Sequence, residues 1–172
     1  MKTQALALLA PFLLAAACGG SDPAVPDGPS PAEALAALRA DAAALRAKAE
    51  HQDPEVTLQH CLIGVAGHGT PATRSAAEAE ALAAEVYARA RNGEDFDLLV
   101  KNHSDDIYPC LYSLALAEPA PPGAHPRAKV APPALGDTAW RLEVGELGVV
   151  VFDGDQAEPR SPFGWHVVRR LK

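Results

Sequence analysis

The chain has 172 residues, with 15 Lys and Arg against 22 Asp and Glu, and therefore a formal net charge of −7. That length suits one domain with appended segments and is too short for two full-sized globular units. A net acidic chain without a run of basic residues lacks the clustered cations of a nucleic-acid binder, so we expect no nucleic acid partner. The 16 Pro and 13 Gly are too many for an all-helical bundle. Together these numbers favour a small acidic α+β domain.

Residues 1–17 have the pattern of an export signal. Lys2 gives a positive start, and residues 5–17 form an uncharged apolar stretch that ends in three alanines. A helix that spans a bilayer needs about 20 apolar residues, so this shorter stretch is typical of a cleaved signal and not of a permanent anchor. The small residues lead directly into Cys18, and this junction resembles a bacterial lipobox. The alternative is an ordinary secretory signal followed by a chance cysteine.

We therefore expect residues 1–17 to be a lipoprotein signal peptide and residues 18–30 a lipidated tether attached through Cys18. Each buried CH₂ of an acyl chain contributes about 0.8 kcal/mol, so several chains make a stable membrane anchor. The Gly, Pro, Ser and Asp residues of the tether cannot bury enough apolar surface to fold. The expected location is a bacterial membrane, at its periplasmic or extracytoplasmic face.

An N-terminal helix is predicted over residues 31–52. Ser30 and Glu33 form a capping box, and Pro31 occupies the first helical position. Apolar residues then follow at alternate spacings of three and four, which gives a narrow apolar stripe. The stripe either packs on the following domain or forms the seam of a short coiled coil, for which its leucines are few.

The rest of the chain alternates between strand and helix patterns. We predict a strand over residues 56–63, a helix that starts at a second capping box and ends at residue 92, a short helix over 96–104, another over 135–142, and strands over 149–152 and 165–171. Residues 107–134 hold seven prolines and no clear periodicity, so a mostly irregular stretch is expected there. This order favours an α+β domain with an antiparallel sheet.

Two cysteines, Cys61 and Cys110, lie beyond the lipobox. An oxidising compartment could join them, but Cys61 falls in a predicted strand, where cysteine is usually a small buried hydrophobic residue. We favour two free thiols and keep the disulfide as the alternative. No CxxC or HxxxH spacing is present, so the sequence predicts no metal site. The six histidines are His51, His60, His68, His103, His125 and His166.

Three segments together resemble the parvulin family of peptidyl-prolyl cis-trans isomerases. VTLQHCLI at 56–63 resembles the first parvulin strand with its active-site histidine. The stretch from Ala76 through NGEDF to SDD at 104–106 is similar to the helix pair of the family. LEVGELG at 142–148 and SPFGWHVV at 161–168 resemble the closing part of the domain. The resemblance implies a parvulin-like domain over residues 54–172, with a four-stranded antiparallel sheet and surrounding helices, whose remaining strand lies near residues 111–114.

The activity implied by the resemblance is the isomerisation of X-Pro bonds. A peptide bond rotates over a barrier of roughly 18–20 kcal/mol because resonance keeps it planar, and X-Pro isomerisation is slow enough to limit folding. No bond is broken, so no nucleophile, metal or cofactor is needed, and we expect no cofactor. The site has to hold the proline ring in an apolar pocket and favour the twisted amide. The implied partners are proline-containing unfolded or exported polypeptides.

The resemblance also implies the site residues. His60 and His166 correspond to the paired histidines of the central strands, and Asp106 to the residue near the substrate carbonyl. The implied catalytic set is therefore His60, Asp106 and His166. The implied substrate-binding set is Val130, Ala131, Leu135 and Phe163. A histidine in a strand is also commonly structural, and Asp106 has the alternative of capping the loop after a helix.

Two departures from the family pattern leave two functions open. The family's GDLGWF stretch is replaced by IYPCLYSL at 107–114, and smaller residues occupy the pocket positions. Losing some tens of Å² of apolar contact costs on the order of 1 kcal/mol of binding. The loop 64–74 holds one Lys or Arg residue, so a preference for phosphorylated substrates is not expected. We favour an active isomerase that assists the folding of exported proteins; the alternative is a catalytically weak parvulin-like chaperone or peptide-binding module.

Overall fold

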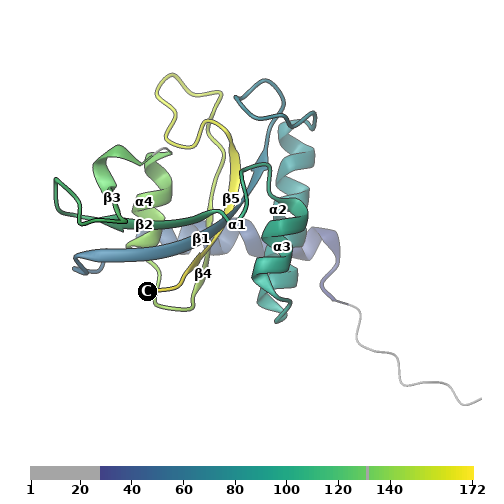
Figure 1. Cartoon of the computed structure of the whole chain (residues 1–172). Helices are drawn as coiled ribbons and strands as arrows, with labels where there is room; N and C mark the ends of the chain where they lie inside the picture. Colours follow the sequence, from purple (N-terminus) through teal and green to yellow (C-terminus); the bar gives the residue numbers. More distant parts are fainter. Residues whose placement is uncertain (1–27, 131) are drawn as a thin grey trace, which may run out of the picture.

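The computed structural model describes residues 28–130 and 132–172. The predictions for residues 1–27, including the signal peptide and lipidation at Cys18, lie outside the described residues. The elements in chain order are α1 (Pro31–Ala47), β1 (Glu55–Gly64), α2 (Ala76–Arg91), α3 (Phe96–His103), β2 (Leu111–Ala115), β3 (His125–Pro126), a 3₁₀ turn η1 (Arg127–Lys129), α4 (Pro133–Ala139), β4 (Leu147–Val150) and β5 (Gly164–Arg170) (Figure 1). None of the described helices has both the length and the apolar character needed to cross a bilayer.

The strands form one mixed sheet in the order β3-β2-β1-β5-β4. β1 pairs antiparallel with β2 and β5, and β5 pairs antiparallel with β4. The fold is α+β as predicted, and β2 lies where the fourth strand was expected. The prediction of four antiparallel strands was wrong, because β3 adds a fifth strand parallel to β2. Two residues, one of them proline, show no alternation from which such a strand could be recognised.

Side chains of the sheet alternate between two hydrophobic clusters, as the pleat requires. On one face Cys61, Ile63 and Val167 pack with α1, α2 and α3. On the other face Leu58 and Val168 pack with α4, where Leu135 and Trp140 are also buried. Figure 1 shows α2 and α3 on one side of the sheet and α4 on the other. His60 lies two residues after Leu58, and His166 two residues before Val168. Their side chains therefore lie on the same face of the sheet as α4.

Helix α1 starts as predicted but ends earlier than residue 52. Both hydrogen bonds of the Ser30–Glu33 capping box are present. At the other end Lys48 takes an extended conformation, with φ −68° and ψ 144°. The next residues bind elsewhere, because Glu50 pairs with Arg127 and the His51 N–H donates to the Trp140 carbonyl. These tertiary contacts, which local sequence does not encode, end the helix at Ala47.

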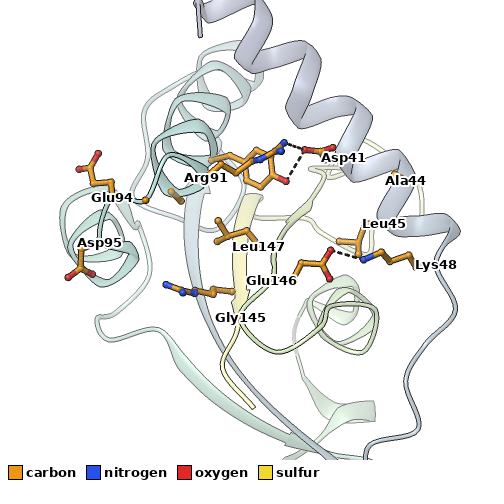
Figure 2. Close-up of a pocket in the computed structure, with 14 residues that line it drawn as sticks. Asp41, Ala44, Leu45, Lys48, Arg91, Glu94, Asp95, Gly145, Glu146 and Leu147 are labelled. Atoms are coloured by element: carbon orange, nitrogen blue, oxygen red, sulfur yellow. Dashed lines mark hydrogen bonds and ion pairs between the residues drawn. The ribbon is translucent and has the colours of Figure 1, made fainter. Parts of the chain in front are cut away.

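The apolar stripe of α1 packs on the domain that follows it. Leu38, Ala42 and Leu45 are at most 6% exposed within the single chain. Charged side chains flank the stripe: Arg39 binds Glu80, and Figure 2 shows Asp41 beside Arg91 and Lys48 beside Glu146. Of the two interpretations of the stripe, packing on the domain is therefore confirmed. α1 is part of the domain core and not of the tether.

Candidate active site

Two histidines from adjacent central strands meet on the α4 face of the sheet. His166 of β5 lies opposite Leu62 of β1, and His60 of β1 lies opposite Val168 of β5. The two rings are thus diagonal neighbours on one face, where side chains are within reach of each other. Their Nδ1 atoms are 2.9 Å apart, and the side chains are 2% and 1% exposed. The structure therefore forms the histidine pair that the resemblance implied.

Glycines at the start of β5 and the end of β1 allow close packing: Gly164 lets β5 approach β1, and Gly64 lets the loop after β1 approach that strand. A Cβ on Gly164 would lie 2.1 Å from the Ile63 carbonyl oxygen, and one on Gly64 would lie 2.4 Å from Oγ1 of Thr70. A side chain at Gly164 would force apart the register that places His166 beside His60. The glycine of the FGWH segment therefore has a packing role in the site.

The Ser-Asp-Asp segment after α3 completes the hydrogen bonding of β1 beyond the end of β2. Oγ of Ser104 accepts from the Leu62 N–H at 3.1 Å. Oδ2 of Asp105 accepts from the Gly64 N–H at 2.7 Å and forms an ion pair with Arg74. Buried backbone donors need such partners. Ser104 and Asp105 thus act on the backbone and fix the residue that follows them, Asp106, beside the histidine pair.

Asp106 contacts His60 and Tyr112 with the same carboxylate oxygen. Oδ2 lies 3.2 Å from Nε2 of His60, and the Tyr112 hydroxyl donates to it at 3.3 Å. Among the described residues Nε2 of His60 has no well-aligned hydrogen-bond partner, so this contact is chiefly electrostatic. The interaction with His60 is nevertheless the main cause that lowers the pKa of Asp106 to about 2. Burial and the nearby charge of Asp106 raise the pKa of Tyr112. Asp106 is therefore an anion and Tyr112 a phenol at neutral pH.

These charges fix the proton positions in the histidine pair. Burial lowers the pKa of His166 well below its usual value, so this ring is neutral at pH 7. Because Asp106 is anionic, the favourable arrangement places a proton on Nε2 of His60, facing the carboxylate. In the tautomer that carries the His60 proton on Nε2, Nδ1 of His60 is an acceptor, and Nδ1–H of His166 donates to it across the 2.9 Å contact. The floor of the site is thus a hydrogen-bonded histidine pair, with a neutral His166, beside one fixed negative charge.

The pair and Asp106 line one cavity of about 290 Å³. Residues 69–71 from the loop after β1 and Phe163 from the segment before β5 complete its mouth, and the two loops rise at the same end of the sheet (Figure 1). Four implied site residues lie together here: His60, Asp106, His166 and Phe163. The other described residues of the wall are Leu62, Gly69, Thr70, Pro71, Asp105, Tyr112 and Pro132.

Two of the other implied substrate-binding residues, Val130 and Leu135, lie elsewhere. Leu135 is 1% exposed and is buried in the hydrophobic cluster under α4. Val130 packs against the same cluster, and neither belongs to the described wall of the cavity. Ala131 lies outside the described residues. Because α4 begins at Pro133 and turns Leu135 toward the core, Pro132 is the residue that reaches the cavity among those described in this segment.

Sequence reasoning missed Tyr112, which forms one side of the cavity. It pairs with Leu58 across β1 and β2, and its ring centroid lies 5.4 Å from that of His60. A signal for it was available, because a strand at 111–114 beside the first strand would place alternate residues on the histidine face. Pro132 gave no such signal, since its position depends on how the proline-rich segment folds back.

A larger groove of about 800 Å³ lies away from the histidine pair, between α1, the end of α2 and β4 (Figure 2). Ion pairs such as Asp41 with Arg91 and Lys48 with Glu146 occupy its rim. The side chains of both pairs are between 34% and 52% exposed, and such pairs contribute little energy. We therefore place the candidate chemistry in the smaller cavity, where buried titratable groups converge.

Both described cysteines are buried free thiols. Burial raises the pKa of Cys61 to about 12, and burial also raises that of Cys110. Thiols with raised pKa values are poor nucleophiles at neutral pH. Neither cysteine is therefore a candidate catalytic nucleophile.

Comparisons with known proteins agree with this geometry. The family model of the rotamases, described as the PPIC-type PPIASE domain, matches residues 60–172. Over 114 residues the chain is 35% identical to a protein of Chromohalobacter salexigens named Chaperone SurA. This match covers 66% of the chain and 22% of that relative, so the chain spans about a fifth of its length. The matched residues contain the histidine pair, Asp106 and the cavity, and the chain belongs to the parvulin-type family of PPIC-type peptidyl-prolyl cis-trans isomerase domains.

Proposed function

We propose that the protein is a peptidyl-prolyl cis-trans isomerase that assists the folding of exported polypeptides. The observation that carries the proposal is the meeting of His60, His166 and Asp106 in one cavity of about 290 Å³. The volume of that cavity and its partly apolar wall of Leu62, Pro71 and Phe163 suit a proline ring with its flanking backbone.

The charge of Asp106 suits the chemistry of amide rotation. In the planar amide, resonance places negative charge on the carbonyl oxygen, and twisting the C–N bond withdraws it. An anion beside that oxygen therefore disfavours the planar state more than the twisted one, which lowers the barrier. The neutral ring of His166 adds no positive charge that would cancel the effect. Rotation then proceeds without breaking any covalent bond.

The surface next to Asp106 suits a polypeptide substrate. Ile107, the next residue, is 87% exposed, and Tyr108 and Leu111 are each 49% exposed. Large apolar side chains that are grouped and exposed commonly mark an interaction surface. Unfolded polypeptides expose apolar residues that can contact such a surface on either side of the proline.

A second candidate is a binding module whose isomerase activity is weak. The position of Leu135 favours it, because this side chain lies in the core and adds no apolar area to the cavity wall. The matched relative is named a chaperone, which fits either role. Both functions require the cavity to bind proline-containing peptides, and only the first requires it to lower the rotation barrier.

A proline-isomerisation assay on a panel of tetrapeptides with different residues before proline distinguishes the active isomerase from the binding module. An active isomerase accelerates the slow phase in proportion to protein concentration, and Asp106→Asn reduces kcat/KM about tenfold, equivalent to about 1.4 kcal/mol. His125→Gln, a change at an exposed histidine, serves as the control. A rate equal to the uncatalysed one, with peptide binding retained, would leave only the binding module.

We also propose that the protein works lipid-anchored at the extracytoplasmic face of a bacterial membrane. The support is the sequence of residues 1–22, with its short apolar stretch ending in small residues before Cys18. Labelled palmitate should be incorporated into the full chain in cells and lost in Cys18→Ser, but not in Cys61→Ser. Secretion of an unlabelled, cleaved chain would instead support an ordinary signal peptide.

A further inference from the structure

Three metal-ligating side chains lie close together beside the histidine pair: His60 and Asp106 line the cavity, and Cys110 is buried next to them, outside the described cavity wall. His60 comes from β1, and Asp106 and Cys110 come from the segment between α3 and β2. Their ligand atoms all lie within 4.8 Å of one another. In a tetrahedral zinc site, ligand atoms about 2.0–2.3 Å from the metal are roughly 3.3–3.8 Å apart. The cluster therefore needs a contraction of at most about 1.5 Å between ligand atoms to reach a coordinating geometry.

One ligand atom of the cluster is buried without a good partner. Nε2 of His60 has no well-aligned hydrogen bond among the described residues, although the side chain is 98% buried. Buried polar atoms are usually satisfied, so an exception of this kind points to a missing ligand. The atom faces the carboxylate of Asp106, whose side chain is 30% exposed and leaves a path from solvent.

His166 is positioned as an outer partner of such a site, which means a residue that hydrogen-bonds a metal ligand without binding the metal itself. A histidine that binds a metal commonly donates its other ring N–H to a fixed acceptor, which sets its orientation. Nδ1 of His60 already lies 2.9 Å from Nδ1 of His166. Moving the proton of His60 from Nε2 to Nδ1, and that of His166 from Nδ1 to Nε2, frees the ligand atom without changing the charge of the pair.

We propose that His60, Asp106 and Cys110 bind one Zn²⁺ ion, and that this ion closes the cavity to proline. The mixed nitrogen, oxygen and sulfur donor set suits a borderline metal such as zinc. Binding releases the thiol proton of Cys110, which leaves Zn²⁺ beside one carboxylate and one thiolate, a neutral set with a fourth position open to water. The inhibitory consequence rests on the proposed isomerase function, whereas binding itself does not.

Co²⁺ is the probe of choice, because cobalt bound to a thiolate absorbs in the near ultraviolet and visible ranges. The full chain with Cys18→Ser retains Cys61 and Cys110 as its thiols. We expect one equivalent of Co²⁺ to produce a thiolate-to-cobalt band, and Zn²⁺ to displace it. Cys110→Ser removes the band, whereas Cys61→Ser, a change at a buried thiol outside the cluster, retains it.

Two further variants keep the test independent of a folding defect in Cys110→Ser. Asp106→Asn, at a partly exposed position, should weaken Co²⁺ binding at least tenfold, and His166→Leu should weaken it about 10–100-fold through loss of the outer partner. His125→Gln is the control at an exposed histidine. Absence of a stoichiometric band, or a band that survives Cys110→Ser in a folded variant, overturns the proposal.

The isomerase assay in the presence of Zn²⁺ separates this proposal from the proposed function. If the metal-free protein is active, one equivalent of Zn²⁺ should abolish the acceleration, and a chelator should restore it. An active protein that binds Zn²⁺ with no loss of rate contradicts closure of the cavity. A metal-free protein without activity overturns the isomerase function, while the cobalt band still reports the metal site.

Discussion

Asp105 and Asp106 are neighbours in the chain, yet their carboxylates bind different parts of β1. Asp105 accepts the Gly64 N–H at 2.7 Å and pairs with Arg74, whereas Asp106 lies 3.2 Å from the ring of His60. One carboxylate thus maintains the backbone of the site, and the other supplies its charge.

This division predicts different defects for the two alanine variants. Asp105→Ala leaves the Gly64 N–H unpaired and should lower the free energy of unfolding by about 1–3 kcal/mol. Asp106→Ala, at a partly exposed side chain, should change stability less but lower kcat/KM about tenfold or more. Urea unfolding and the isomerisation assay, performed on both variants, measure the two effects. Equal losses of stability in the two variants would contradict the division.

The losses of stability caused by substituting the two buried histidines should not be additive. His60→Leu or His166→Leu leaves the remaining Nδ1 without its 2.9 Å partner, which costs about 1–3 kcal/mol. The double variant removes both polar atoms, so its loss of stability should be smaller than the sum of the single losses. A double-mutant cycle by urea unfolding measures the coupling. Additive losses would show that the contact contributes nothing to stability.

Stability should decline as the pH falls below about 6.5. Because the folded-state pKa of His166 lies below its unfolded value, the unfolded chain binds this proton first. The contribution of the neutral ring is thus complete above pH 6.5 and is lost below it, by up to about 1.4 kcal/mol per pH unit. Asp106, with its pKa lowered to about 2, loses its contribution only as the pH falls below about 4.

Unfolding curves at pH 7.5, 6.5 and 5.5, recorded with a chelator present, test this dependence. The decline should be shallower in His166→Leu than in the natural chain, whereas His125→Gln should follow the natural chain. Parallel curves for the natural chain and His166→Leu would show that the buried ring does not carry the pH dependence.

Helix α1 should be required for the stability of the domain, although it precedes the residues that the family model matches. Leu38 is fully buried against α2 and the sheet, so Leu38→Ala should cost about 2–5 kcal/mol. Leu35→Ala, at a partly buried position of the same helix, is the matched control and should cost less. Thermal unfolding of both variants provides the comparison; equal small losses would show that α1 is a dispensable extension.

Local patterns predicted the elements whose signals are local. Both helix N-termini with capping boxes, at Ser30 and Ser75, are present with both hydrogen bonds. The alternation in β1 correctly predicted a strand, and the family resemblance supplied the pairing of its His60 with His166. These features depend on short-range hydrogen bonding and side-chain parity, which a sequence displays directly.

Features that depend on tertiary contacts could not be predicted in this way. The end of α1 is set by contacts of residues 50 and 51 with η1 and with Trp140, the residue that follows α4, and β3 exists only because it lies along β2. The cavity wall differs from expectation for the same reason, since the fold of the proline-rich segment decides that Pro132 and not Leu135 reaches it. The neighbourhood of His60, Asp106 and Cys110 likewise arises from the fold and not from motif spacing.

Exchange NMR on a proline peptide tests the central claim most directly. With a catalytic amount of the metal-free protein, cross-peaks between cis and trans peptide should appear, and amide shifts should change at Thr70, Tyr112 and Phe163. The cross-peaks should vanish for His60→Leu and for the same peptide with alanine in place of proline. Shifts elsewhere on the surface, or binding at the cavity without any exchange, would contradict catalysis by the histidine pair and Asp106.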